Sequence, residues 1–312
     1  MELHQLQMLR ELGELGSVKA VAETLSVTPS AVSQQLALLQ RGVDTPLTRK
    51  EGRNLVLTEA GAVLAEAGAG VINAMAQAKA AIGAYQEDPA GRVTISGFHS
   101  AGQALFAPLV RALRGMEHDG GGSPQVLLSD EDVAQHDFPA LAARYDLVLA
   151  HRMDHSPPWP QPQVQVLPLA HEPLDVALSA DHPLAALDSL SPADVAAHPW
   201  VTSRAGYSPD DVLAAIAAVA SHPANVVHRI NDYSTVAALV STGEVIGLLP
   251  RYTSSASLAP AGGPAVVLRP LTGISTKRRI DILARPESLK RTAVVRVAHA
   301  LQAVMAELTG GH

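Results

Sequence analysis

The sequence predicts a helical N-terminal unit, one long helix, and a large unit of alternating helices and strands. Three observations lead to this fold class. Apolar residues recur at helical spacing as far as about residue 58, and an alanine-rich stretch with helical spacing follows to about residue 87. From residue 91 onward, short β-rich runs alternate with helical segments, which is typical of α/β layers on mostly parallel sheets.

The first 58 residues have the pattern of a helix–turn–helix unit. Pro29 suits the first turn of a helix, so we expect the third helix to begin there. The outward face of this helix carries Ser30, Ser33 and Gln34. Short polar side chains on an exposed helix suit base-edge and phosphate contacts in a DNA major groove, and a glutamine can pair with an adenine edge. The apolar positions that place the helices on a common core are Leu3, Leu6, Leu9, Leu12, Leu15, Val18, Ala22 and Leu25.

The charge balance argues against a protein that coats nucleic acid indiscriminately. The formal net charge is −7, whereas indiscriminate binding depends on neutralising many phosphates. Between Arg41 and Arg53, however, four cations stand against Asp44 and Glu51, at the position of a loop or wing. The sequence therefore predicts a site-specific DNA binder with a local basic patch.

Composition also restricts the compartment and the chemistry. The chain has no cysteine, no cationic N-terminal segment leading into an apolar stretch, and no apolar run long enough to span a bilayer. We therefore expect a cytoplasmic protein with no disulfide, no thiol chemistry and no membrane partner.

The alanine-rich stretch at residues 59–87 predicts a linker helix. Thr58 suits its N-cap, and Asp88-Pro89-Ala90-Gly91 ends it. Its apolar residues form a narrow seam that favours contact with a second copy of the chain, and packing on its own domain is the alternative. The seam consists of Leu64, Gly68, Val71, Met75, Ala78, Ile82 and Tyr85.

The third unit, residues 91–312, is expected to form two lobes. The Pro-rich stretch 156–162 is the expected crossover between two sheets, and the chain is expected to return near Arg269-Pro270, so that lobe 1 comprises residues 91–162 and 269–312 and lobe 2 residues 163–268. The expected strands are Arg92–Ser96, Gln125–Ser129, Asp146–Ala150, Gln163–Leu169, Leu174–Ser179, Val226–Ile230, Val245–Leu249, Ala265–Leu268 and Arg279–Ala284. The expected helices are Ser100–Arg114, His136–Ala143, Pro192–Ala197, Asp210–Ser221, Ser234–Ser241 and Glu287–Leu308.

A series of short motifs runs along the whole chain. They are Ala20–Leu39, Pro46-Leu47, Gly52-Arg53, Leu57-Thr58, Ala60-Gly61, Asp146–Leu149, His182–Leu184, Asp232, Leu239-Val240, Gly243 and Gly247–Pro250. In this order and spacing they resemble the LysR-type transcriptional regulators. The resemblance implies an all-α winged helix–turn–helix domain, a linker helix, and an α/β effector-binding domain of two Rossmann-like lobes, similar to periplasmic binding proteins. It also implies binding to double-stranded operator DNA as a homodimer or homotetramer, with RNA polymerase as a further partner.

Two segments depart from the family pattern. Where the family commonly has a glycine followed by Leu-Phe-Glu-Arg, this chain has Asp44 and then Leu47-Thr48-Arg49-Lys50. The recognition helix ends in Leu39-Gln40, where the family commonly has leucine and glutamate. These changes concern the wing and its packing, so they bear on operator preference rather than on DNA binding itself.

For DNA, the resemblance implies specific contacts on the third helix and the wing. Ser30, Ser33 and Gln34 would face the groove. Thr28 and Pro29 would lie at the helix entry, and Arg53 would reach a phosphate. The alternative for Ser30 is a helix N-cap.

A small-molecule effector is expected between the two lobes. Ser100 directly follows the first strand and opens a helix, where free backbone N–H groups can bind a ligand. The resemblance adds further contacts after later strands, and helix-start donors with an arginine would suit a carboxylate or another small anion. The alternative is that the hydroxyls merely cap helices. The added residues are Thr202, Ser203, Arg204, Asp232, Tyr233, Ser234, Gly247, Leu248 and Leu249, with Phe98 and His99 shaping the pocket.

Enzymatic and metal chemistry are not expected. His151 and His155 have the spacing of two ligands on a helix, but Pro157, Pro158 and Pro160 predict a loop there. The chain shows no phosphate loop, dinucleotide fingerprint or nucleophile elbow, so we expect no cofactor and no catalytic residue.

Two other classes of protein fit the same pattern. A small-molecule binding protein could use the N-terminal helices for assembly only, and it would have no salt-sensitive affinity for DNA. An α/β enzyme with an unrecognised site would turn over its ligand.

Overall fold

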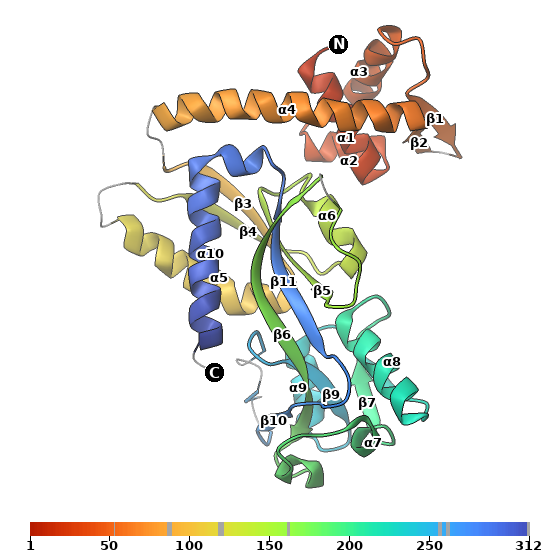
Figure 1. Ribbon diagram of the computed structural model, residues 1–312, viewed down its shortest axis with the longest axis vertical. Helices are drawn as coiled ribbons and strands as arrows, with labels where there is room; N and C mark the ends of the chain where they lie inside the picture. Colours follow the sequence, from red (N-terminus) through yellow and green to blue (C-terminus); the bar gives the residue numbers. More distant parts are fainter. Residues whose placement is uncertain are drawn as a thin grey trace.

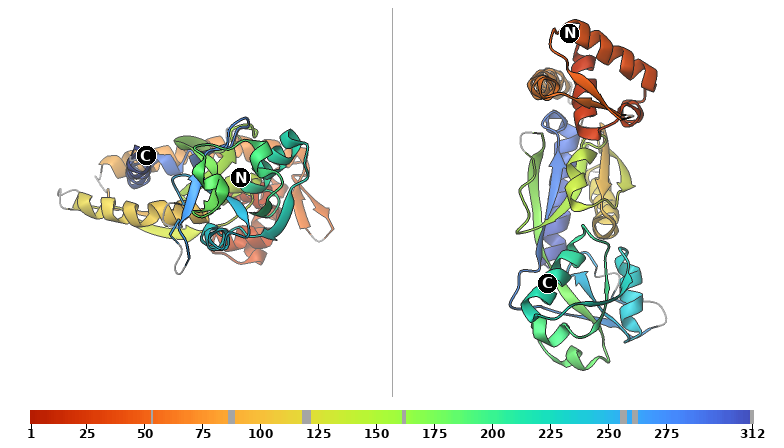
Figure 2. Two further views of the ribbon diagram at one scale, coloured as in Figure 1. Left: turned by 90° about the horizontal axis from the view of Figure 1, so that it is seen from below. Right: turned by 90° about the vertical axis from the view of Figure 1, so that its right-hand side faces the viewer.

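The computed structural model describes residues 1–52, 54–85, 89–117, 122–160, 163–254, 258–259 and 263–310. The molecule is elongated: the helical N-terminal unit lies at one end and the two lobes follow along the long axis (Figure 1). A view from the side shows the same order of three parts (Figure 2). None of the described helices is both long enough and apolar enough to cross a membrane.

The N-terminal unit is a three-helix core followed by a β-hairpin. Its core contains the expected apolar positions Leu9, Leu12 and Val21, together with Leu36 and Leu39 of the third helix. The hairpin is the wing of the expected winged helix–turn–helix unit. The elements are α1 (Leu3–Leu15), α2 (Val18–Thr24), α3 (Pro29–Arg41), β1 (Thr48–Glu51) and β2 (Asn54–Leu57).

The long helix α4 spans Glu59–Tyr85. The Thr58 hydroxyl caps it, accepting from the Gly61 N–H at 3.0 Å and donating to the Pro46 carbonyl at 2.6 Å. The expected seam divides into two parts. Leu64 joins the helix–turn–helix core and Gly68 lies against Leu6 of α1, whereas Val71, Met75 and Ile82 are exposed.

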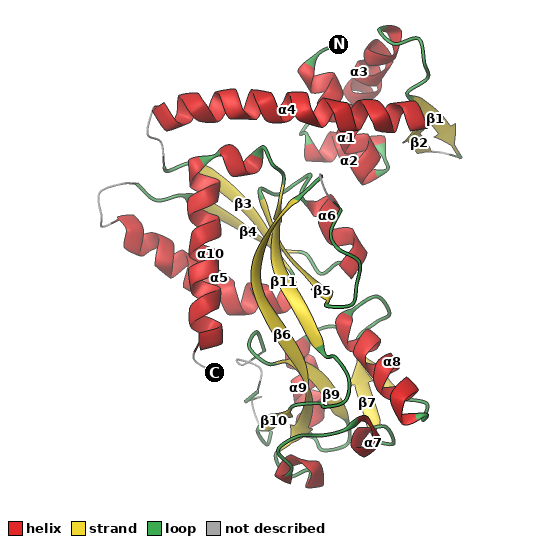
Figure 3. Cartoon of the chain, in the orientation of Figure 1, coloured by secondary structure: helices red, strands yellow, loops and turns green. Residues whose placement is uncertain are grey.

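The α/β unit is built on one mixed sheet, shown as the central group of strands in Figure 3. The described residues form a nine-stranded sheet in the order β4-β3-β5-β11-β6-β9-β7-β8, with β10 also paired to β6. The strands are β3 (Arg92–Gly97), β4 (Gln125–Asp130), β5 (Leu147–Met153), β6 (Gln165–Ser179), β7 (Pro199–Thr202), β8 (Asn225–Arg229), β9 (Ile246–Pro250), β10 (Val266–Arg269) and β11 (Lys277–Ala284). The helices are α5 (His99–Glu117), α6 (Phe138–Leu141), α7 (Pro192–Val195), α8 (Ser208–Ala220), α9 (Tyr233–Ser241) and α10 (Thr292–Gly310), with short 3-10 turns at Gln135–Asp137, Pro183–Ala186 and Ser288–Lys290.

The sequence led us to expect a mostly parallel sheet, but the observed sheet is mixed. Strands β3, β4 and β5 are parallel to one another, and so are β7, β8 and β9. The central strands β6 and β11 run antiparallel to their neighbours. β6 unites the two expected strands 163–169 and 174–179 into one, and β7 is not among the strands expected above.

The change of lobe occurs later in the chain than expected. Up to Pro173, β6 pairs with β11 of lobe 1, and from Leu174 it pairs with β9 of lobe 2. Residues 156–160 of the Pro-rich stretch therefore stay in lobe 1, where Trp159 packs in the core. Leu271 packs in the core of lobe 2, so the return also falls after the expected position at residue 269. The physical reason is that a long strand, rather than a loop, carries the chain across.

Candidate functional site

The exposed face of α3 carries the side chains that the sequence singled out. Val32 and Leu36 are buried in the core, so Ser30, Ser33 and Gln34 are left on the solvent side. Thr28 is the N-cap: its hydroxyl accepts from the Ala31 N–H at 3.2 Å. Ser30 therefore does not cap the helix. The Ser30 hydroxyl instead lies 3.0 Å from that of Thr28, at the helix entry.

Ser33 and Gln34, in the middle of this face, differ in which of their hydrogen-bonding groups are free. The Ser33 hydroxyl donates to the Pro29 carbonyl at 3.0 Å, so only its oxygen lone pairs remain for another partner. The Gln34 side chain is exposed, and within the described part of the chain its amide makes no hydrogen bond. Its donor and acceptor are thus both available. Arg53 lies outside the described residues.

The departures from the family pattern have a structural counterpart at the wing. The Gln40 amide donates to the Val43 carbonyl at 2.9 Å and to the Thr45 carbonyl at 3.0 Å, and its oxygen accepts from the Leu47 N–H at 2.7 Å. Gln40 therefore holds the loop between α3 and β1 in place. Asp44 is exposed in this loop, and Arg49 on β1 is exposed and pairs with Glu51 at 3.1 Å.

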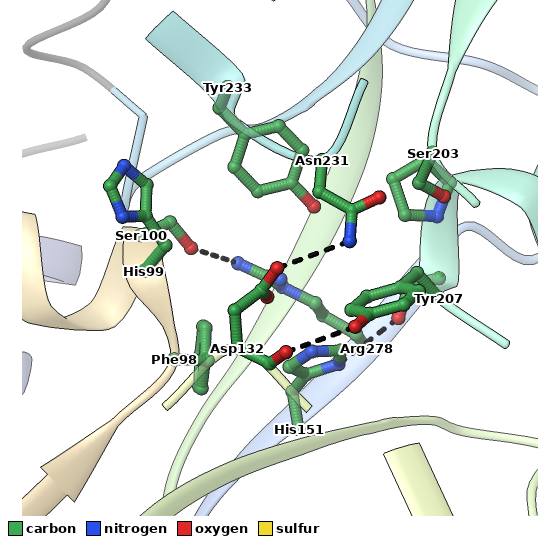
Figure 4. A pocket seen from close by; sticks show the side chains of 12 residues that line it. Phe98, His99, Ser100, Asp132, His151, Ser203, Tyr207, Asn231, Tyr233 and Arg278 are labelled. Carbon is green, nitrogen blue, oxygen red and sulfur yellow. Dashed lines mark hydrogen bonds between the residues drawn. The ribbon is translucent and has the colours of Figure 1, made fainter. Parts of the chain in front are cut away.

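A second candidate site lies between the two lobes (Figure 4). It is a cavity of about 20 Å³, which is room for one water molecule. Lobe 1 contributes side chains that follow β3 and β4 and side chains on β5 and β11, and lobe 2 contributes side chains from the loops before α8 and α9 and from the first turns of these helices. The lining residues are Phe98, His99, Ser100, Asp132, His151, Ser203, Tyr207, Ser208, Pro209, Asn231, Tyr233 and Arg278.

Arg278 lies at the floor of this cavity and is charge-paired within the protein. Its side chain is 1% exposed, and that of its partner Glu172 is 0% exposed. The Arg278 guanidinium donates to Glu172 at 2.7 Å and 3.0 Å, and to the hydroxyls of Ser100 and Thr253 at 3.2 Å and 3.0 Å. Arg278 and Glu172 are cross-strand partners on β11 and β6, so the register of these two strands brings the charges together.

Hydrogen bonds and an ion pair connect the two lobes at the rim of the cavity. Asp132 of lobe 1 accepts from the Asn231 amide at 3.1 Å through its side chain, and from the Tyr207 hydroxyl at 3.1 Å through its carbonyl. His99 of lobe 1 lies 2.6 Å from the Asp232 carboxylate of lobe 2. Burial acts to raise the pKa of Asp232, but hydrogen bonds from Ser234 and Thr235 and the nearby His99 outweigh it and hold the pKa below its usual range. These bonds keep the cleft closed.

His151 forms an uncharged wall of the cavity. It lies on β5, its Nδ1 is 3.1 Å from the Ser208 hydroxyl, and its ring packs edge-on against those of Phe98 and Phe138. Burial, and secondarily the positive charge of Arg278, hold the pKa of His151 well below its ordinary value. His151 is therefore neutral near neutral pH.

The structure brings some of the expected effector residues together and not others. Ser100, Ser203 and Tyr233 line the cavity. Arg204 is exposed beside the rim, 3.9 Å from Asp132, and Thr202 is buried behind it. The Asp232 carboxylate caps α9 as well as meeting His99, and Ser234 is its hydrogen-bonding partner.

Gly247, Leu248 and Leu249 do not line the cavity. They lie in the middle of β9, in the cores of lobe 2. An added Cβ at Gly247 would lie 3.0 Å from Val236 and 3.2 Å from Val201, so the glycine serves close packing of α9 on the sheet.

Sequence reasoning missed Asp132, Asn231, Arg278 and its partner Glu172. The available signal was a charged residue inside a run that otherwise reads as a strand: Glu172 precedes the apolar half of β6, and Arg278 precedes Ile280. A charge in a buried strand needs a partner, and that requirement points to a functional position.

The two histidines with the spacing of metal ligands lie in different local structures. His151 is on a strand and His155 follows in an exposed turn, so the two do not share a helix face. In the ranges that the structure describes, no three His, Cys, Asp or Glu side chains come together in a way that could hold a metal ion.

A winged helix–turn–helix unit with a free polar recognition face, joined by a long helix to a two-lobed α/β domain, defines a transcriptional regulator that binds DNA. Two family models match the chain in this arrangement. Residues 3–62 match the bacterial regulatory helix-turn-helix protein of the lysR family, and residues 86–306 match the LysR substrate binding domain. The chain belongs to the LysR family of transcriptional regulators, which are not enzymes.

Similar proteins agree with this assignment. The chain is 27% identical over 291 residues to the small neutral protease regulatory protein of Streptomyces coelicolor, covering 91% of this chain and 86% of that protein. It is 24% identical over 254 residues to an uncharacterised HTH-type transcriptional regulator, YybE, of Bacillus subtilis, covering 80% and 82% of the two chains.

Solved structures share the fold along the whole chain. A full-length OxyR variant from Pseudomonas aeruginosa superposes with a TM-score of 0.66 at 18% identity, covering 98% of this chain and 95% of that chain. Full-length CbnR in complex with its target DNA superposes with a TM-score of 0.51 at 18% identity, covering 97% and 100%.

Proposed function

We propose that this regulator reads its operator through the exposed face of α3, as a dimer or a pair of dimers, and responds to a small molecule bound between the lobes. The single observation that carries the DNA proposal is the free amide of Gln34 on a helix whose opposite face is fixed in the core. An amide in that position can make a bidentate contact to an adenine edge.

The other residues of the face have supporting roles in this proposal. The Ser33 oxygen accepts a hydrogen bond from a base or reaches a phosphate-bound water. Thr28, Pro29 and Ser30 meet the DNA backbone at the helix entry, where the N-terminal end of α3 favours a phosphate. Arg53 pairs with a phosphate of the same half-site.

Assembly through α4 accounts for its exposed apolar residues. Val71 and Ile82 are 51% and 59% exposed, and both lie on the narrow seam. A second copy of α4 would cover them and would place two α3 helices on one face of the assembly. An operator with two half-sites is the expected counterpart.

The cleft supports an effector that differs from the anion expected from the sequence. Glu172 already neutralises Arg278, and at the rim the Asp132 carboxylate lies 3.9 Å from the Arg204 guanidinium, so each arginine has a carboxylate partner. We therefore expect a neutral effector with hydrogen-bond donors that pair with Asp132. Any effector larger than a water molecule has to separate the lobes, because it must displace the bonds that Asn231 and His99 make across the cleft.

The test of the DNA proposal is binding of the purified full chain to the DNA upstream of its own gene, against scrambled DNA, over a salt series. A Ser33→Ala/Gln34→Ala variant and a control, Gln302→Ala on α10, are measured alongside. Loss of a bidentate base contact of about 1–3 kcal/mol corresponds to a loss of affinity for the operator of about five- to 150-fold, with little change for scrambled DNA. The control retains wild-type affinity.

Equal losses on operator and scrambled DNA would contradict base reading by this face. If the upstream DNA shows no preference at low salt, selection from a random duplex pool replaces it. Failure of that selection too would favour a binding protein whose N-terminal helices serve assembly only.

A further inference from the structure

The helix α1 is held on two sides by different parts of the molecule. On one side it faces α3: Leu9 and Leu12 share a core with Leu36 and Leu39, and His4 lies 2.8 Å from the Gln35 amide oxygen. On the other side it faces lobe 1 of the α/β domain, at the end of β11. Together with α4, which packs on α1 and on the turn Ser288–Lys290 of lobe 1, α1 therefore links α3 to the α/β domain.

The contact between α1 and lobe 1 is a buried cluster of charges. Arg285 directly follows β11, and its side chain is 6% exposed, while that of Glu11 on α1 is 0% exposed. The Arg285 guanidinium binds both oxygens of Glu11, one of them at 3.0 Å, and binds Glu14 at 2.5 Å. This is a forked contact of one guanidinium with two carboxylates, which accepts only a narrow range of directions.

A second ion pair crosses the same contact with the charges reversed: here α1 supplies the cation and lobe 1 the carboxylate. Arg10 of α1 lies 2.6 Å from Glu287 of lobe 1, and its guanidinium also lies 3.4 Å from Glu11 and 3.8 Å from Glu14. Each side of the contact thus supplies both a cation and a carboxylate. Rotation or sliding of α1 on lobe 1 would separate buried opposite charges, which costs far more than sliding two apolar surfaces.

We infer that Arg285 is a positioning residue for the recognition helix. By binding Glu11 and Glu14 it restricts the direction in which α3 projects from the α/β domain, and so, together with pairing through α4, it restricts which spacing of two half-sites an assembled regulator accepts. The inference rests on the proposed binding to paired half-sites. Arg285 itself does not touch DNA: it lies on the opposite side of α1 from α3.

A buried ion pair restricts the relative orientation of the two elements that it joins more than it increases the free energy of unfolding. Replacing such a pair by apolar side chains of similar size is often neutral for stability, whereas removing one partner leaves an uncompensated charge. Two variants therefore separate the roles. Arg285→Met breaks the cluster and leaves the buried Glu11 with Arg10 at 3.4 Å as its counter-charge, whereas Glu11→Met/Arg285→Met removes both charges, so that the second variant stays folded if the first does not.

The experiment compares DNAs that carry one or two copies of a half-site recovered by selection from a random duplex pool with the wild-type protein. The two-copy DNAs differ in the spacer by single base pairs over one helical turn. We expect the wild type to prefer one spacing by about tenfold or more, because the two α3 helices are held at a fixed separation. Both variants should keep single-site affinity within about twofold and reduce the spacing preference to about threefold or less.

Two further variants sharpen the result. Arg269→Met is the control: it removes a partly buried arginine whose hydrogen bonds, to Ala185 and Leu268, stay within lobe 2. It should keep the wild-type spacing preference. Arg285→Lys keeps the positive charge but lacks the planar guanidinium that binds two carboxylates at once. We expect a spacing preference between those of the wild type and Arg285→Met.

A spacing preference that survives in both cluster variants overturns the inference. So does an equal loss of affinity for single and paired half-sites, since that would show a general effect on the helix–turn–helix unit. Failure of the wild-type protein to prefer paired half-sites at any spacing instead removes the proposed mode of DNA binding, and the inference with it.

Discussion

Gly61 offers a sharp test of how α4 is joined to the helix–turn–helix unit. It lies in the first turn of α4, where its N–H binds the Thr58 hydroxyl. A Cβ added to Gly61 would lie 1.9 Å from the Leu47 carbonyl oxygen and 2.9 Å from its carbonyl carbon. These are backbone atoms, so the clash cannot be relieved by a side-chain rotation. Gly61→Ala must move the start of α4 away from Leu47.

The size of the effect follows from the interactions that Leu47 makes. Its side chain belongs to the buried core, and its carbonyl accepts from the Thr58 N–H at 3.0 Å. Partial loss of a buried leucine costs about 2–3 kcal/mol, and loss of the hydrogen bond costs about 1 kcal/mol. Alanine gains about 1 kcal/mol over glycine within a helix. We expect a net loss of about 2–3 kcal/mol in the free energy of unfolding of the helix–turn–helix unit.

Gly70 in the same helix is the matched control. No atom outside its own helix lies within 4 Å of an added Cβ, so Gly70→Ala should show only the helical gain of about 1 kcal/mol. Urea unfolding followed by circular dichroism, with hydrogen exchange to locate the change, measures both. If Gly61→Ala is as stable as the wild type, or if Gly70→Ala loses as much stability as Gly61→Ala, the close approach of α4 to Leu47 is refuted.

Three further predictions concern the cleft and the seam. Glu172→Gln leaves Arg278 buried without its counter-charge and should cost about 3–5 kcal/mol in chemical unfolding, whereas Glu172→Met/Arg278→Met should cost much less; equal losses would show that the charges themselves do not matter. The pKa of His151 is lowered in the folded chain, so below pH 6.5 the folded state binds fewer protons than the unfolded state. The contribution of neutral His151 to the free energy of unfolding is therefore complete above the ordinary pKa of 6.5 and is lost as the pH falls below it. The folded chain should therefore lose stability as the pH falls below 6.5, and this loss should be smaller in His151→Gln; identical pH profiles would contradict a buried neutral histidine. Val71→Glu should shift the assembly toward monomer in sedimentation velocity, whereas Gln77→Glu, which adds the same charge beside the seam, should not; an unchanged sedimentation coefficient for Val71→Glu would exclude the seam as the interface.

The recognition helix was predictable because its signals are local. Pro29 at the first helical position and Thr28 before it set the start, and the apolar spacing of Val32, Leu36 and Leu39 set the buried face. Each signal lies within one or two helical turns of the residue that it positions. The exposed face with Gln34 follows directly.

The cleft was predictable only in part because its floor is not local. Ser100 was found from its place after a strand, but Arg278 and Glu172 are 106 residues apart and meet through the register of β11 on β6. Register depends on tertiary pairing, which a single sequence does not display. Gly247 was assigned to the floor for its position in a family motif, whereas the structure uses its lack of a side chain for packing against Val236.

The continuous strand β6 restricts how the length of this chain can change during evolution. Side chains alternate along it, so that Leu174, Val176 and Leu178 fill one core cluster of lobe 2 while Asp175, itself buried, lies on the other face of the strand and binds Arg251 at 2.6 Å. Insertion or deletion of one residue near Pro173 would reverse this alternation and turn Asp175 into the core. Homologues should therefore differ in length at surface loops, and the passage from one lobe to the other should keep a constant number of residues even where its sequence has diverged.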